Sequence, residues 1–314
     1  MNTSEGPVRY LLLWMDDIES RSLVRIRRDI EDAELPPADQ VEIDVWIESG
    51  GGDGNTAYKL ALMLRSAATR IRIVVPDYAK SAATLLALVG DEIYMAPGAE
   101  LGPLDAQMPE EGKGTISALN IARAADAVAS DAVAIATRGG AELLYTTGLS
   151  RAETLNAMLR FAASFSEPLV RQLDPKMVHY AKEWLRVTTR YAERLLTKTI
   201  GAERAASVAT KLVEEFPTHG FVISYDDAEN LKLPVRPLET YDLLDLVRVW
   251  HRVVEDGEAI VAFGPVQEFM LGADTQDDTT GGENDQPEAS EPSESHQEPE
   301  SNANGAESTV STQT

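Results

Sequence analysis

The sequence predicts an α/β fold with a parallel sheet, added helices and a disordered acidic tail. Three observations predict it. Strand-like and helix-like segments alternate along the first hundred residues, a long helical stretch follows, and residues 273–314 carry 11 acidic side chains and no Lys or Arg. Strands that alternate with helices through short turns are typical of parallel sheets with right-handed crossovers. A polar, acidic segment cannot bury enough apolar surface to fold, so we expect the tail to be disordered.

The first hundred residues contain four expected strands and three expected helices. The strands are runs of apolar and β-branched residues bounded by turn residues, and the helices show apolar residues at helical spacing. One strand, 41–47, alternates apolar and acidic residues, which predicts that one of its faces meets solvent. The expected strands are 10–14, 41–47, 71–75 and 92–95, and the expected helices are 22–33, 55–68 and 81–89.

The later part of the chain reads as mostly helical. Residues 116–136 form an alanine-rich helical pattern, and residues 151–215 are almost entirely helical in pattern. A short strand is expected at 221–224, followed by a helix that Ser224 caps, and an amphipathic helix at 241–255. We therefore expect one domain over residues 1–272, with a helical insertion at about 116–215, and the tail from 273.

Composition excludes several classes of function. The chain has no cysteine, so disulfides and thiolate metal sites are excluded. A net charge of −24 argues against nucleic-acid and anionic-membrane partners, which require a surplus of Lys and Arg. No apolar run approaches the roughly 20 residues that cross a bilayer, and the N-terminal run is too short for a secretory signal. We expect a soluble, cytoplasmic protein without membrane insertion.

Two strand ends carry residues suited to acyl transfer. The strand 41–47 ends in a Ser-Gly-Gly-Gly-Asp turn, and Ser81 lies at the start of the helix after strand 71–75. Ligands of open α/β sheets bind at the carboxyl ends of the strands. Glycines allow backbone N–H groups to approach a developing oxyanion, and a helix N-terminus adds a favourable dipole. The same pattern also fits a phosphate-binding turn or a plain turn, with Ser81 as a helix N-cap.

The segments ESGGGDGNTAYKLALMLR and VPDYAKSAATLLALVGDEIYMAPGAELGPLDAQ resemble the serine dehydrogenase proteinase (SDH) family of the Clp/crotonase superfamily. The resemblance extends over about residues 8–236, although Lys232 stands where glycine is usual. It implies a Clp/crotonase-type ββα spiral and a serine peptidase with Ser81 as nucleophile. Gly51 or Gly52, with the Ala82 N–H, would form the oxyanion hole. A homo-oligomer acting on a peptide or protein substrate, without cofactor or metal, is also implied.

The general base does not follow from the resemblance. Clp proteases have their histidine where this chain has Asp105, and their aspartate falls near His219, so one hypothesis exchanges the two roles. Relatives with a Ser-Lys dyad place a lysine near 120–123, where this chain has none, and Lys113 is the substitute. Lys80 is better placed for substrate or backbone contacts. His219, Asp105 and Lys113 each also have a purely structural reading.

Two other classes of function stay open. The uncertain base allows an inactive scaffold that keeps the fold and binds peptides or protein partners. The same pair of backbone N–H groups could instead bind the thioester enolate of an acyl-CoA in a crotonase-like enzyme. A serine at the start of the helix favours the peptidase over the crotonase.

Overall fold

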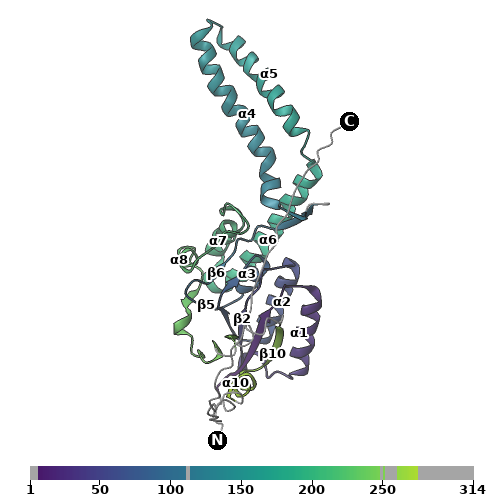
Figure 1. The fold of residues 1–314 in the computed structure, drawn as a ribbon, viewed down its shortest axis with the longest axis vertical. Helices are drawn as coiled ribbons and strands as arrows, with labels where there is room; N and C mark the ends of the chain where they lie inside the picture. Colours follow the sequence, from purple (N-terminus) through teal and green to yellow (C-terminus); the bar gives the residue numbers. More distant parts are fainter. Residues whose placement is uncertain (1–5, 111–113, 248–249, 252–259, 275–314) are drawn as a thin grey trace, which may run out of the picture. The chain divides into compact units, whose positions relative to one another are not determined.

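The computed structural model describes residues 6–110, 114–247, 250–251 and 260–274. A six-stranded sheet in the order β10-β1-β2-β3-β5-β9 organises the fold (Figure 1). Its strands run parallel except β10, which pairs with β1 in the antiparallel direction. The mixed α/β architecture with a mostly parallel sheet confirms the predicted fold class. The strands are β1 Val8–Met15, β2 Val41–Ile47, β3 Arg70–Val75, β5 Glu92–Met95, β9 Val235–Pro237 and β10 Ile260–Pro265.

Both faces of the sheet are covered. Alternate residues of β1 illustrate this, because Leu12 belongs to the core under the crossover helices and Leu13 belongs to a second core on the other face. Tyr241 and Trp250, from the C-terminal part of the chain, cover that second face. A strand buried on both faces has a nearly continuous apolar sequence, as β1 does. The crossover helices are α1 Ser20–Asp32, α2 Gly54–Ala67 and α3 Ala82–Ala87.

Strand β2 departs from the expectation of a half-exposed strand. All of its residues are buried except the partly buried Glu42, and Asp44 has no exposed surface. The Asp44 carboxylate accepts hydrogen bonds from Arg9 Nε at 2.7 Å, Arg72 Nη1 at 3.2 Å and the Tyr241 hydroxyl at 2.6 Å. Burial and the neighbouring Asp44 charge raise the pKa of Tyr241, so its hydroxyl stays protonated and donates. Cationic and hydroxyl partners from other segments therefore make the acidic strand position compatible with burial.

A helical region follows the first half of the sheet. Helix α4 begins two residues later than expected, because residues 114–117 before it form strand β8, which pairs with β7. The helix also continues ten residues beyond its expected end. Helices α4 and α5 lie side by side (Figure 1), and we call them, with the connecting residues 147–150, the helical hairpin. None of the helices within the described ranges is long and apolar enough to cross a bilayer. The helices are α4 Ala118–Thr146, α5 Arg151–Val170, α6 Pro175–Ile200, α7 Ala202–Glu214, α8 Tyr225–Asn230 and α10 Val266–Asp274.

Short strands and the late segments correct several expectations. Residues 221–224 do not form a strand, since Ile223 makes only a single bridge to Leu101. Within the expected helix 241–255, residue 241 is not helical, residues 242–245 are turns, and residues 246–247 and 250–251 are helical. Residues 248–249 and 252–255 lie outside the described residues. Residues 273–274 end α10, so disorder is wrong for them, and 275–314 lie outside the described residues. The small strands are β4 Tyr78–Ala79 with β6 Glu100–Leu101, and β7 Gln107–Glu110 with β8 Gly114–Ser117.

Candidate active site

Ser81 occupies a sharp turn between β4 and the first residue of α3. Its backbone has φ 49° and ψ −115°, a left-handed conformation that costs a non-glycine residue about 1–3 kcal/mol. Only two other non-glycine residues in the described ranges, Glu34 and Lys232, have positive φ. The Ser81 side chain makes no capping hydrogen bond to α3. Ser81 thus occupies the N-cap position of α3, but its hydroxyl does not cap the helix.

The glycine turn after β2 lies directly against Ser81. Gly51 has φ 118°, and a Cβ added there would lie 2.8 Å from Ser81 Cβ and 3.2 Å from the Ala82 nitrogen. Gly52 has φ 127°, and a Cβ there would lie 2.5 Å from the Ile18 carbonyl oxygen. Both positions therefore exclude any side chain, and the backbone of the turn approaches the serine as an oxyanion hole requires.

The hydrogen bonds of the turn distinguish between its two candidate donors. The Gly51 N–H donates to Ser49 Oγ at 3.2 Å, and the Gly51 carbonyl accepts the Ile18 N–H at 2.6 Å. Within the described residues, no acceptor is present for the N–H groups of Gly52 and Ala82. These two N–H groups are thus available to a ligand, whereas Gly51 contributes the close approach.

A pocket of about 620 Å³ opens beside Ser81. Its wall combines the glycine turn, the start of α3, the β7–β8 region, helix α6 and the loop after α7. Trp184 of α6 is 46% exposed and contributes an aromatic surface. The residues that line the pocket are Asp17, Gly50, Gly52, Asp53, Gly54, Ser81, Ala82, Leu85, Leu104, Ala106, Gln107, Thr115, Trp184, Thr188 and His219.

His219 lines this pocket together with Ser81, but Asp105 does not form a hydrogen bond with His219. The buried Asp105 carboxylate accepts the Leu119 N–H at 3.0 Å and lies 3.5 Å from Gln107 Nε2. His219 Nδ1 is buried, and no described residue provides it with a hydrogen-bond partner. The predicted pairing of Asp105 with His219 is therefore absent. The physical reason is that the first N–H groups of α4 lack partners within the helix, and Asp105 satisfies one of them.

Lys80 makes the backbone contacts that its position beside Ser81 predicts. Its Nζ lies 2.6 Å from Glu100 Oε1 and donates to the carbonyl groups of Leu101 and Phe221, each at 3.4 Å. A Cβ added at Gly102 would lie 2.8 Å from Lys80 Cδ, so this glycine makes room for the lysine. Lys80 thus connects the Ser81 turn to β6 and to the segment that follows His219.

The remaining base candidates are not part of the described pocket wall. Lys113 lies outside the described residues. Arg123, at the position where relatives with a Ser-Lys dyad carry lysine, donates to the Glu214 carbonyl oxygen at 2.6 Å. His219 is therefore the one predicted base that the described residues bring to the Ser81 pocket.

Sequence reasoning missed several residues around Ser81. The buried Ser49 accepts the Gly51 N–H, and its place before three glycines was the available signal. Asp17 follows β1 at the carboxyl edge of the sheet, where ligand-facing residues are expected. Burial and the nearby Asp77 raise the pKa of Glu48, which precedes the same turn. Trp184 had no local signal, because its helix is remote in sequence.

Comparison with known proteins gives a family match. Residues 12–137 match the family described as ClpP-like SDH-type serine proteinase. Two uncharacterized proteins of Methanocaldococcus jannaschii are similar. MJ0137 is 27% identical over 209 residues, which cover 66% of this chain and 58% of the relative. MJ1495 is 26% identical over 227 residues, which cover 69% and 63%. The chain thus spans less than two thirds of the length of either relative.

Two solved structures are also similar, both titled 1510-N membrane-bound stomatin-specific protease. One is a serine-to-alanine mutant, with 15% identity, a TM-score of 0.45, and coverage of 78% of this chain and 86% of the other. The second is a lysine-to-alanine mutant in complex with a substrate peptide, with 16% identity, a TM-score of 0.45, and coverage of 76% and 80%.

Proposed function

Because residues 12–137 match the family of ClpP-like SDH-type serine proteinases, we propose that this chain is a serine peptidase that forms an acyl-enzyme on Ser81. The observation that carries the proposal is the Ser81 turn itself. A strained, positive-φ serine without a capping hydrogen bond lies against a glycine turn that excludes every side chain. Strain of this kind persists where a functional geometry requires it.

The proposed reaction has two halves. Ser81 Oγ attacks the carbonyl carbon of a peptide bond and gives its proton to a base, and the N–H groups of Gly52 and Ala82 bind the resulting oxyanion. The C–N bond then breaks, the amine takes the proton from the base, and the acyl group remains on Ser81. Water attacks this ester in the second half and releases the carboxylic acid and the free serine. No cofactor or metal enters the scheme.

His219 is the proposed base, because it lines the Ser81 pocket. Its Nδ1 lacks a partner among the described residues, so the scheme has no orienting carboxylate of the triad type. Lys113 is the second candidate. Loss of activity in His219→Ala with retention in Lys113→Ala would support the first assignment, and the reverse result would support the second.

A second candidate function is a catalytically inactive scaffold that binds peptides or protein partners. The observation that favours it is that His219 Nδ1 has no hydrogen-bond partner among the described residues, so this nitrogen is not paired with the Ser81 hydroxyl. The pocket would then hold an extended peptide without cleaving it. Homo-oligomeric assembly and a cytoplasmic location complete the proposal, and both rest on the sequence arguments above.

Labelling with a fluorophosphonate serine-hydrolase probe tests the proposal. We expect the purified full chain to be labelled, and we expect Ser81→Ala to lose the label while its circular dichroism spectrum stays that of the parent protein. Ser66→Ala is the matched control, since it removes an exposed serine hydroxyl of α2 that contacts only the Met63 carbonyl. Absence of labelling in the folded parent protein would reject the peptidase and favour the scaffold.

A further inference from the structure

The helical hairpin exposes an unusual amount of apolar surface. Beyond its first turns only Ala132 and Thr154 are buried among the described residues of α4 and α5. Large apolar side chains on both helices are exposed, with fractions of 66% for Val133, 60% for Leu155 and 57% for Leu159. Contiguous apolar patches of this kind on a water-soluble protein mark a contact surface.

The two helices pack closely against each other and form a single layer. A Cβ added at Gly139 would lie 3.2 Å from Met158 Sδ, and one at Gly140 would lie 3.3 Å from Met158 Cγ. The two glycines therefore let Met158 of α5 lie against α4. No other described element forms a second layer over these two helices. Stable helical architectures bury their apolar stripes between at least two layers.

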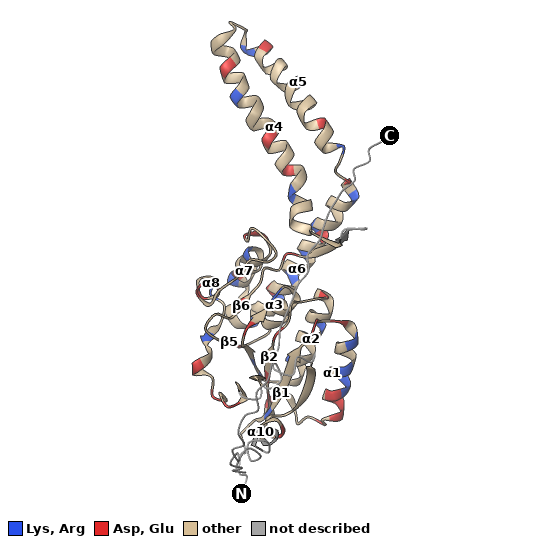
Figure 2. Cartoon of the chain, in the orientation of Figure 1, with Lys and Arg blue, Asp and Glu red and all other residues tan. Residues whose placement is uncertain are grey.

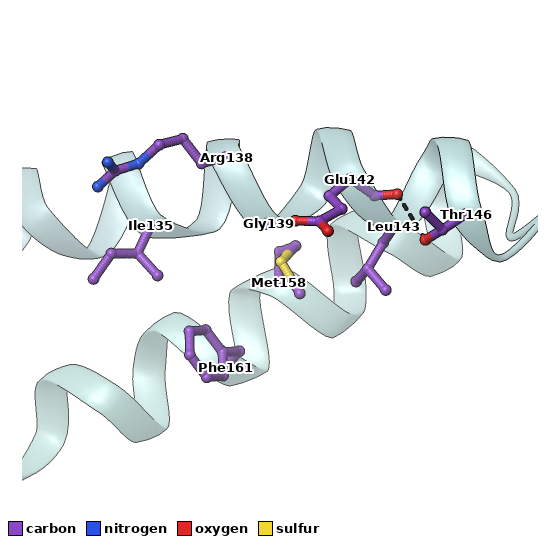
Figure 3. Close-up of a pocket in the computed structure, with 8 residues that line it drawn as sticks. All are labelled: Ile135, Arg138, Gly139, Glu142, Leu143, Thr146, Met158 and Phe161. Atoms are coloured by element: carbon purple, nitrogen blue, oxygen red, sulfur yellow. Dashed lines mark hydrogen bonds between the residues drawn. The ribbon is translucent and has the colours of Figure 1, made fainter.

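The two faces of this layer differ in charge. One face holds a groove of about 490 Å³ with Ala136 and Gly140 among its lining residues and Arg151 as the only charged one. Leu155 and Leu159 also line this groove. Figure 3 shows the second pocket, where Arg138 and Glu142 accompany the apolar residues. Pairing through the second pocket would desolvate charges, which costs free energy, so the groove face is the better contact surface.

The charge of the hairpin favours a second copy of this chain as the occupant. The whole chain carries −24, but residues 118–170 hold four basic and five acidic side chains, a net charge of −1. Figure 2 shows the same sparse charge on α4 and α5. Two acidic copies repel each other through most surfaces, since like charges oppose association. A nearly neutral apolar face is the surface through which two copies can approach.

We propose that the groove face of the helical hairpin pairs with the same face of a second copy. The contact is isologous, so Leu155 and Leu159 of each copy lie over the Ala136–Gly140 groove of the other. The small residues of the groove accept the leucines, and four helices form the two layers that one copy lacks. The inference assigns a surface to the homo-oligomeric assembly proposed above, and it does not depend on peptidase activity at Ser81.

Light scattering coupled to size-exclusion chromatography, over a concentration series of the full chain, tests the pairing. We expect a dimer or larger oligomer for the parent protein. Leu155→Glu together with Leu159→Glu should weaken association by about 100-fold or more, because each copy then buries two carboxylates. Val24→Glu on α1 is the matched control, since Val24 is 67% exposed and lies outside the hairpin. Circular dichroism checks that each variant keeps its helices.

A cross-linking experiment provides a second readout. The chain has no cysteine, so Thr137→Cys in the groove wall and Val24→Cys each introduce a unique thiol. A bismaleimide should join two copies through residue 137 and not through residue 24. A parent protein that stays monomeric would overturn the proposal, and so would an oligomer that persists in the double glutamate variant. A monomer that instead sediments with phospholipid vesicles through the same leucines would also overturn it.

Discussion

The sheet and the helical hairpin differ in how far their apolar side chains are buried within the chain. Both faces of the sheet are covered within the chain, and even the acidic Asp44 is buried with two arginines and a tyrosine hydroxyl as partners. The hairpin leaves large apolar side chains such as Leu155 exposed. The Ser81 turn lies in a region of closely packed backbone. The proposed contact surface lies on the hairpin, where apolar side chains are exposed. Two pairs of substitutions compare these two regions directly, and a fifth substitution tests the sheet region alone.

The largest difference in the free energy of unfolding is expected between a buried ion pair of the sheet and an exposed ion pair of the hairpin. Asp44→Ala leaves Arg9 and Arg72 without their buried carboxylate and should lower the free energy of unfolding by about 3–5 kcal/mol. Glu167→Ala removes an exposed hairpin pair with Arg171 and should change it by less than about 0.5 kcal/mol. Urea denaturation measures both. Equal losses would show that the sheet network contributes no more than a surface pair.

Glycine substitutions sharpen the comparison further. Gly51→Ala places a Cβ 2.8 Å from Ser81 Cβ at φ 118°, so we expect a loss of about 2–3 kcal/mol and of fluorophosphonate labelling. Gly140→Ala lies within helix α4, and its Cβ would lie 3.3 Å from the flexible Met158 and at ordinary contact distance, 3.8 Å, from Thr154 Cγ2. Higher helix propensity should therefore offset the contact to within about 1 kcal/mol. Thermal unfolding measures the stability of both variants, and fluorophosphonate labelling measures the reactivity of Ser81 in each. Full labelling of Gly51→Ala would contradict the close approach described here.

The smallest expected effect is a pH dependence of stability that Asp91, which precedes β5, contributes. Burial opposes the charge of Asp91, but hydrogen bonds from Arg65 and the Ile71 N–H, with Lys198 nearby, lower the pKa of this carboxyl below 3.8. A lowered pKa in the folded state stabilises the protein above pH 3.8, and that stability is lost as the pH falls through the folded-state pKa. Asp91→Asn should remove this acid dependence and cost about 1–2 kcal/mol at neutral pH.

Unfolding curves of the parent and the Asn variant, recorded between neutral and acid pH, provide the measurement. The two curves should converge as the pH falls, because the parent loses the contribution of Asp91 there. Parallel curves over the whole range would show that the contacts of Asp91 with Arg65 and Ile71 do not favour its charged form.

Local sequence patterns were sufficient to predict the parallel core and the Ser81 turn. Periodicity marked the strands and crossovers, and the glycines and Ser81 stand at strand ends, where topology brings them together. The left-handed φ of 65° at Lys232 also explains why the resemblance expects glycine at that position. Each of these signals lies within a short stretch of chain.

Features that depend on contacts between remote segments could not be predicted. Asp105 was expected to orient His219, but the route of β7, β8 and α4 gives its carboxylate to the Leu119 N–H instead. Trp184 reaches the pocket from a helix about a hundred residues beyond Ser81. The buried state of Asp44 depends on Tyr241, which is 197 positions away. No pattern within a strand reveals such partners.

The pairing of β10 with β1 has a consequence for how the chain folds during its synthesis. Tyr10 pairs with Pro265, and Met15 pairs with Ile260, so the first strand meets this edge partner about 250 residues later. During synthesis on the ribosome, β1 therefore has an open edge until almost the entire folded region has emerged. Unpaired strand edges recruit other chains, and late long-range contacts slow folding. Until residues 260–265 are available, the open edge of β1 should therefore expose nascent chains to pairing with strands of other chains.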